Sequence, residues 1–398
     1  MKKSIKTFLK HPTKDNSNRS ANPAVIRAST ILFNSMQELY QHEKKIKKHQ
    51  RVSHYSYGRY GSSTTIELEN ILKELEQAFH IFLTGTGFGG IALAIMSLCR
   101  PGDEILVSDN VYGPTKEISE KLLKEFNVLA KFYNPDSFED LKGKVTKKTK
   151  MILVENPGSN TFEFQDLSKI VNLAKNKKIF TFLDNTWGTP LYLKPLKLGF
   201  DMSFSSATKY FSGHSDAMGG SLAVNKKVFK QIMFFYKLSG YRMSADEAYL
   251  IIRGLRTLDT RLNQHYQNTK KVINFLKKQK KVKEILYPYN PSSKNYKLWK
   301  KYYSGATGLL SIVIKSKKKS SVIKFVNSLE LFGIGYSWGG FESLAILQDL
   351  RSNKKGEYIQ GRKYYRFYKD EHIVRLHIGL EDPKDLINDL KSSLKYVK

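Results

Sequence analysis

Short apolar runs alternate with helical patterns in the first half of the chain, and this alternation constrains the fold most. The runs and the amphipathic patterns between them occupy residues 104–108, 114–126, 151–155, 166–174, 180–184 and 202–206. Strands that alternate with helices predict a mostly parallel sheet with helices on both faces. Ligands of such sheets bind beyond the carboxyl ends of the strands, and Asp184 and Ser206 both fall at such ends. The sequence therefore predicts an α/β domain with a site at that edge.

The groups that follow two of these strands suit one cofactor. One strand ends in Asp184, and another leads through Ser206 and Thr208 into Lys209. Pyridoxal 5′-phosphate (PLP) needs an amine for its aldehyde, an anion that keeps its ring nitrogen protonated, and hydrogen-bond donors for its phosphate. Because lysine is abundant here, the Ser-Ser-x-Thr-Lys run alone also fits an ordinary loop. The carboxylate 25 residues earlier favours PLP.

A glycine-rich turn precedes these strands. Residues 85–90 satisfy G-x-G-x-x-G, follow the apolar run 81–83 and open a helix, with Asp109 about 20 residues further on. A dinucleotide-binding unit is the rival interpretation. Bare glycine backbone at a helix N-terminus binds any phosphate, however. A nicotinamide enzyme has no obvious use for the lysine and aspartate, so the sequence favours a cofactor with one phosphate.

The 398 residues predict an arm and two domains. Residues 1–58 are polar and read as an extended arm that packs on another subunit, 59–250 form the cofactor-binding domain, and 251–398 form a smaller α/β domain. Within these, a helix face runs from Leu68 to Phe79, and one long helical stretch covers 244–277. The small domain has strand candidates at 311–314, 343–347 and 373–378, helices at 321–331 and 383–394, and a loop at 287–293.

The chain carries 67 basic and 36 acidic residues, a formal charge of +31. Such a field attracts nucleic acid. The lysines are scattered along the whole chain, however, which favours a general lysine bias over a binding tail. The nearest approach to a patch is residues 351–369, where basic and aromatic residues interleave, and a solvated loop or hairpin is the favoured interpretation. Nucleic-acid binding remains the alternative from a different class.

Other classes of protein find little support in the sequence. The longest apolar run, residues 90–99, is far shorter than the roughly 20 residues that a membrane span requires. A single cysteine fits a reducing cytoplasm. No cysteine or carboxylate stands at metal-ligand spacing beside His42, His49 or His214, so we expect no metal site.

Several motifs make the chain similar to the Cys/Met-metabolism family of PLP-dependent enzymes. The matching segments include the turn at Gly87, and they occur in the family's order. The others are residues 57–59, 109–112, 184–187, 207–210, 213–218, 253–258, 336–344 and 374–382. The resemblance covers the chain from about residue 55 to its C-terminus. It implies the PLP-dependent transferase fold of the aspartate aminotransferase type, fold type I, with a mostly parallel seven-stranded sheet and a smaller C-terminal α/β domain.

The resemblance also implies how PLP is held. Lys209 would bind the aldehyde and, once freed, move the Cα proton, while Asp184 would pair with the ring nitrogen and Tyr112 would stack on the ring. By the same resemblance, several groups would bind the phosphate. They are the amides of Gly87 and Phe88, the hydroxyls of Ser206 and Thr208, and Tyr57 with Arg59 from a neighbouring subunit.

The resemblance further implies a substrate clamp and a reaction. Arg375, with Ser337 and the backbone near Trp338, would bind the α-carboxylate of an amino acid. Taken singly, Tyr112 and Trp338 read more simply as core aromatics and Arg375 as a structural ion-pair partner. Tryptophan at 338 resembles the β-lyases of the family, which implies cleavage of the Cβ–S bond of L-cystathionine in methionine biosynthesis. The γ-synthase and γ-lyase reactions remain alternatives. Because Tyr57 and Arg59 would come from a neighbouring subunit, the resemblance also implies a homotetramer built from dimers.

Overall fold

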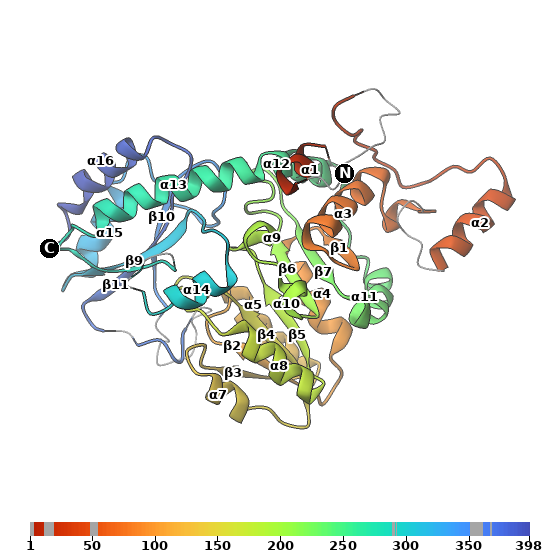
Figure 1. Cartoon of the computed structure of the whole chain (residues 1–398), viewed down its shortest axis with the longest axis horizontal. Helices are drawn as coiled ribbons and strands as arrows, with labels where there is room; N and C mark the ends of the chain where they lie inside the picture. The colour runs from red at the N-terminus through yellow and green to blue at the C-terminus, as the bar shows by residue number, and fades with distance from the viewer. Residues whose placement is uncertain are drawn as a thin grey trace.

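The larger of two sheets has seven strands in a computed structural model that describes residues 4–11, 20–47, 55–288, 291, 293–350, 361–366 and 368–398. Their order is β1-β7-β6-β5-β4-β2-β3, and Figure 1 shows them in the middle of the molecule. The strands are β1 (His80–Thr84), β2 (Glu104–Ser108), β3 (Leu129–Tyr133), β4 (Thr149–Glu155), β5 (Phe180–Asp184), β6 (Met202–Ser206) and β7 (Gly220–Val224).

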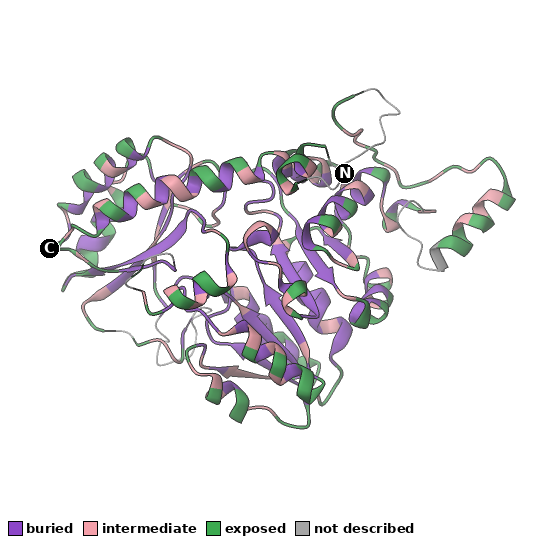
Figure 2. Ribbon diagram, in the orientation of Figure 1, coloured by how far each residue is buried: buried purple, intermediate pink, exposed green. Residues whose placement is uncertain are grey.

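Strands β3, β2, β4, β5 and β6 run parallel, and β7 pairs antiparallel with β6 and with β1. This arrangement confirms the predicted mostly parallel sheet. Alternate residues of β4 belong to two different hydrophobic cores. Ile152 and Val154 pack with α8 (Leu167–Lys177), whereas Met151 and Leu153 pack with α4 (Gly87–Leu98) and α11 (Lys226–Ser239). Since both faces of the sheet are covered, its strands are largely buried (Figure 2). The exception is the edge strand β3, in which only Tyr133 is buried.

A smaller sheet of four antiparallel strands belongs to the C-terminal part of the chain, in the order β10-β11-β9-β8. Its strands are β8 (Val282–Leu286), β9 (Leu309–Lys315), β10 (Leu344–Gln348) and β11 (Glu371–His377). Three of them confirm predicted strands, and β8 is an addition. The helices of this region are α13 (Leu258–Leu276), α14 (Tyr296–Tyr302), α15 (Lys319–Asn327) and α16 (Pro383–Leu394).

The remaining helices precede the strands of the large sheet, connect them or, in the case of α12, follow the last of them. They are α1 (Ile5–Lys10), α2 (Met36–Lys47), α3 (Ser63–Glu76), α5 (Gly113–Glu117), a π-helical turn (Ile118–Leu122), α6 (Leu123–Glu125), α7 (Phe138–Gly143), α9 (Thr189–Tyr192), α10 (Pro195–Leu198) and α12 (Ala245–Arg256), with a short 3-10 turn at Gly58–Tyr60.

Three local expectations are wrong. The N-terminal arm is not wholly extended, because it contains α1 and α2, and α2 projects from the body (Figure 1). Helix α3 ends at Glu76, where Gln77 takes a left-handed φ of 56°, so Phe79 lies beyond the helix and is 44% exposed. The helical stretch 244–277 is two helices, α12 and α13, that meet at Thr257. The expected boundary at residue 250 falls within α12 and stays a prediction.

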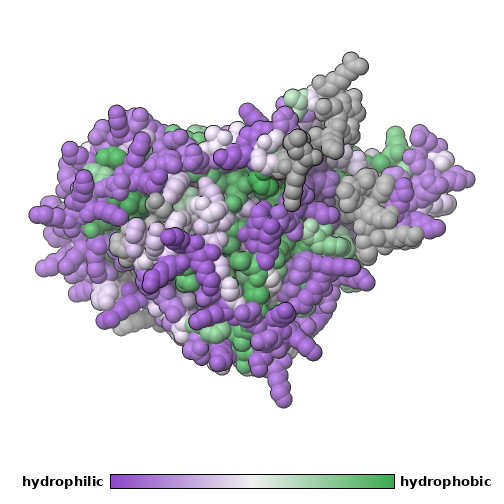
Figure 3. Space-filling model, in the orientation of Figure 1, coloured by the Kyte–Doolittle hydropathy of each residue, from purple (hydrophilic) through white to green (hydrophobic). Residues whose placement is uncertain are grey.

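The surface of the described residues is mixed in hydropathy (Figure 3). Hydrophilic side chains cover much of the visible face around apolar patches near its middle, and they gather at no single site (Figure 3). None of the described helices is long and apolar enough to cross a membrane. Within the described ranges no three His, Cys, Asp or Glu side chains are grouped to hold a metal ion. The basic aromatic segment lies partly outside the described residues, at 351–360 and 367.

Candidate active site

Lys209 lies in the turn that follows β6. Its Nζ donates a hydrogen bond to Ser337 Oγ at 2.6 Å and lies 5.5 Å from the ring centre of Trp338. Burial and the nearby Arg375 guanidinium lower the pKa of Lys209 to about 8, against a smaller opposing effect of Asp184. A lysine with a lowered pKa holds more of the neutral amine that attacks an aldehyde.

Asp184 ends β5, beside the strand that leads to Lys209. Its Oδ1 accepts hydrogen bonds from the backbone N–H and the hydroxyl of Thr186 at 2.9 and 2.6 Å. Burial raises the pKa of Asp184 to about 6. The carboxyl group makes no ion pair with any residue that the structure describes. A protonated ring nitrogen of PLP would supply the missing cation.

Glu155 is a site residue that the sequence analysis missed. It ends β4 directly beside Asp184, its partner in the sheet register, and Glu155 Oε2 accepts the backbone N–H of Tyr112 at 2.6 Å. Burial and the Asp184 carboxylate raise the pKa of Glu155 well above its usual range. The sequence could have indicated Glu155 as a site residue, because it ends a predicted strand at the same sheet edge as residue 184.

The glycine-rich turn forms the start of α4 and offers a place for a phosphate. Thr86 caps the helix by accepting the Gly89 N–H at 3.0 Å, so the first-turn amides of Gly87 and Phe88 remain free of intrahelical partners. A Cβ atom at Gly87 would lie only 2.5 Å from Ser206 Oγ. Glycine therefore keeps open the space between the helix and β6, and the site fits PLP.

A turn of the smaller domain completes the wall near Lys209. Ser337 takes a φ of 81° and Gly339 a φ of 93°, and a Cβ at Gly339 would lie 3.0 Å from the backbone of Lys209. Arg375 on β11 donates to the Ser337 carbonyl at 3.1 Å and has no acidic partner among the described ion pairs. Burial lowers the pKa of Arg375 to about 10, which still leaves a cation able to bind a carboxylate.

One cavity joins most of the residues expected in the site. Its lining includes Gly87, Phe88, Tyr112, Glu155, Ser159, Asp184, Ser206, Thr208, Lys209 and Trp338. Ser337 is joined to this cavity by its hydrogen bond with Lys209, and Arg375 by its hydrogen bond with the Ser337 carbonyl. The roles of these residues stay predictions, but their positions at one place are what the proposed chemistry requires.

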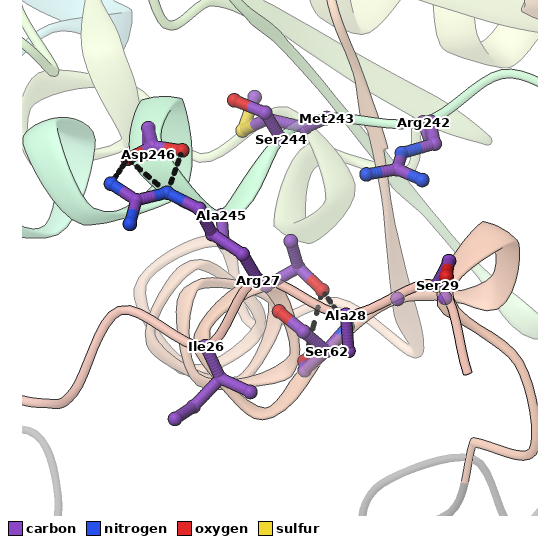
Figure 4. Close-up of a pocket in the computed structure, with 13 residues that line it drawn as sticks. Ile26, Arg27, Ala28, Ser29, Ser62, Arg242, Met243, Ser244, Ala245 and Asp246 are labelled. Carbon is purple, nitrogen blue, oxygen red and sulfur yellow. Dashed lines mark hydrogen bonds and ion pairs between the residues drawn. The ribbon is translucent and has the colours of Figure 1, made fainter. Parts of the chain in front are cut away.

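Tyr57 and Arg59 do not line this cavity. Tyr57 is 47% exposed, and the Arg59 guanidinium lies over the rings of Tyr57 and Tyr60. Gly58, which lies between these two residues in the sequence, and Gly61 line a different pocket. Figure 4 shows that pocket between the N-terminal segment 26–29 and the start of α12, where Arg27 pairs with Asp246. Within one chain, Tyr57 and Arg59 are therefore separate from the predicted phosphate site.

Comparisons with known proteins agree with this geometry. The Cys/Met metabolism PLP-dependent enzyme family matches residues 6–395. A cystathionine beta-lyase of Bordetella avium is 36% identical over 398 residues, 98% of each chain. An L-alanine/L-glutamate racemase of Wolbachia pipientis wMel is 34% identical over 381 residues, 94% of this chain and 92% of the relative.

A solved structure gives the same result for the fold. The cystathionine gamma synthase of Xanthomonas oryzae pv. oryzae superposes with a TM-score of 0.89 at 26% identity, over 100% of this chain and 99% of its own. The predicted fold and cofactor are confirmed. The chain belongs to the Cys/Met metabolism family of PLP-dependent enzymes.

Proposed function

We propose that this enzyme cleaves the Cβ–S bond of L-cystathionine and releases homocysteine, pyruvate and ammonia. The observation that carries the proposal is the Lys209 amine, held between the Ser337 hydroxyl and the Trp338 ring in the cavity that contains Asp184. The similarity to a cystathionine beta-lyase over 98% of the chain supports the choice of substrate.

The residues of this chain have distinct tasks in that reaction. When bound, PLP supplies an electron sink that stabilises negative charge at Cα of the amino acid. Asp184 holds the proton on the ring nitrogen that makes the sink effective. Lys209, with its pKa lowered to about 8, takes the proton from Cα and delivers a proton to the departing sulfur. The remaining three-carbon fragment takes up water and yields pyruvate and ammonia.

Arg375 and its turn orient the substrate. The guanidinium would bind the α-carboxylate through two parallel hydrogen bonds, while its contact with the Ser337 carbonyl fixes it beside Lys209. Orientation of this kind directs the Cα–H bond toward the lysine and can contribute several kcal/mol to catalysis. Burial raises the pKa of the Tyr112 hydroxyl, so the phenol keeps its proton near neutral pH.

Product analysis tests the proposal. Purified enzyme is given L-cystathionine, and we expect homocysteine and pyruvate. Cysteine with 2-oxobutyrate would identify a γ-lyase, and a requirement for an activated homoserine ester would identify a γ-synthase. Lys209→Ala should lose the yellow cofactor absorbance and nearly all turnover, whereas Lys175→Ala, at an exposed position of α8, should keep both.

Racemisation of an amino acid is a second candidate, since a racemase is 34% identical over 381 residues. Racemisation needs proton donors on both sides of Cα, and Lys209 and Tyr112 enter the cavity from different elements. Formation of D-alanine from L-alanine, measured on a chiral column, distinguishes this activity. D-alanine without pyruvate from L-cystathionine would replace the first proposal by the second.

We also propose a homotetramer assembled from two dimers, in which Tyr57 and Arg59 contact the cofactor phosphate bound by another copy of the chain. Both residues are exposed and neither lines the Lys209 cavity of its own chain, which supports this assembly. A cytoplasmic location fits the single, buried Cys99. Light scattering measures the mass of the assembly, and cell fractionation tests the location.

A further inference from the structure

Arg362 is a buried cation brought by the C-terminal part of the chain to the large sheet. Its side chain is only 4% exposed. Arg362 Nε lies 3.3 Å from Asp109 Oδ2, and Nη2 lies 2.8 Å from Glu163 Oε1. Nη1 also donates to the Thr161 hydroxyl. Sequence reasoning placed this residue in a solvated loop or patch, which is wrong for position 362.

The two acids that Arg362 joins belong to the two loops that carry cavity residues. Asp109 follows β2 and begins the loop that leads to Tyr112, and Glu163 lies in the loop that begins after Glu155. Asp109 Oδ2 also accepts the backbone N–H of Tyr364 at 3.0 Å. The strap, which we define as residues 361–366, therefore holds both loops from one side.

The loops contact each other next to the cavity. The Tyr112 N–H donates to Glu155 at 2.6 Å, and the Ser159 N–H donates to the Asn110 carbonyl at 2.8 Å. Tyr112, Glu155 and Ser159 all line the cavity of Lys209. A shift of either loop would thus move Tyr112, which is expected to stack on the cofactor ring.

The charges of this cluster balance only when Arg362 is present. Asp109 and Glu163 carry two negative charges, and Lys116, 2.9 Å from Asp109, carries the second positive charge. Asp109 and Glu163 are 0% and 6% exposed at their side chains. Two buried carboxylates with one cation would repel each other and separate the loops.

We propose that Arg362 is a positioning residue, which clamps the loops after β2 and β4 so that Tyr112 and Glu155 keep their places in the active-site wall. The inference rests on the proposed roles of Lys209 and Tyr112, but not on the identity of the amino-acid substrate. The planar fork of the Arg362 guanidinium matters as well as its charge, because one nitrogen contacts Asp109 and another contacts Glu163.

Two variants separate positioning from simple charge balance. Arg362→Lys keeps the charge and loses the fork, and the double variant Arg362→Met/Glu163→Gln removes one charge of each sign. Arg366→Met is the matched control, an exposed arginine in the same strap. Each holoenzyme is examined for melting temperature, for kcat and KM on the amino acid that the wild type turns over, and for circular dichroism at the cofactor absorption band.

We expect both Arg362 variants to melt near the wild-type temperature, to lose kcat by roughly 10- to 100-fold with a much smaller change in KM, and to show a weaker cofactor circular dichroism. Arg366→Met should match the wild type. Wild-type kcat and dichroism in both Arg362 variants would overturn the proposal. Equal losses in Arg366→Met, or a large drop in melting temperature in both Arg362 variants, would also overturn it. The dichroism stays informative even if L-cystathionine is not the substrate.

Discussion

At the scale of single residues, the site depends on how neighbouring charges adjust one amine. The Lys209 amine is buried beside a guanidinium and a carboxylate, and the burial and the guanidinium lower its pKa. The neutral amine is the form that attacks the cofactor aldehyde. Combination of the cofactor-free protein with PLP should therefore become faster as the pH rises through about 8.

Arg375→Met tests that explanation directly. Removal of the guanidinium removes a repulsive positive charge, so the pKa of Lys209 rises and the pH profile for combination with PLP moves to higher pH. Stopped-flow absorbance at the cofactor band measures the profile. Arg366→Met, an exposed substitution, should leave the midpoint in place. An unchanged midpoint or a shift to lower pH in Arg375→Met would show that Arg375 does not act on the lysine.

The residues of the site differ in how far a sequence predicts them. Lys209 and Asp184 were predictable because each follows a recognisable strand and each has a chemistry that PLP needs. Arg362 was not, because its partners Asp109 and Glu163 are 253 and 199 positions away in the chain. A distant ion pair leaves no local pattern, so only the folded chain places it.

At the scale of elements, four of the parallel strands were predictable, whereas β3 and β7 were not. Strands β2 and β4 contain the continuous apolar runs Ile105–Val107 and Met151–Val154, as expected for strands buried on both faces. In β5 and β6, Thr181 and Ser203 interrupt the apolar residues. Strand β7 begins Gly220-Ser221, and small residues give no apolar signal. The fold needs glycine at 220, since a Cβ there would lie 2.4 Å from Thr84 Oγ1. The close approach of β7 to Thr84 thus requires a residue without a side chain, and the start of β7 therefore lacks the apolar pattern that predicts a strand.

The start of helix α4 gives a prediction for cofactor affinity. Gly87→Ala places a Cβ 2.5 Å from Ser206 Oγ and should push the helix and β6 apart at the phosphate site. Overpacking of about 1–3 kcal/mol corresponds to roughly 10- to 100-fold weaker binding of PLP. Spectroscopic titration of the cofactor-free protein measures the dissociation constant.

A matched control separates crowding from a general effect of the substitution. A Cβ at Gly143, the last residue of α7, would have nothing within 4 Å, so Gly143→Ala should bind PLP like the wild type. The melting temperature of each cofactor-free protein shows whether the fold is intact. Wild-type affinity in Gly87→Ala would mean that the phosphate does not use this turn.

At the scale of the whole molecule, one chain has an incomplete set of the expected phosphate contacts. Gly58, between Tyr57 and Arg59 in the sequence, lines the pocket of Figure 4, whereas Gly87, Ser206 and Thr208 line the cavity of Lys209. If Tyr57 and Arg59 act on the cofactor, a second chain must present them. The net charge of +31 gives no comparable argument for a nucleic-acid partner, because hydrophilic side chains are spread over the visible face (Figure 3).

Mixing of two inactive variants tests this shared site. Lys209→Ala removes the amine of a site, and Arg59→Ala removes the expected phosphate contact that the chain gives to its neighbour. In a hybrid dimer one site carries both defects and the other carries neither. Random pairing of equal amounts makes about half of the dimers hybrid, so activity should return to about a quarter of the wild-type value. If Arg59 acts within its own chain, every site in the mixture keeps one defect, and the mixture remains as inactive as its parts.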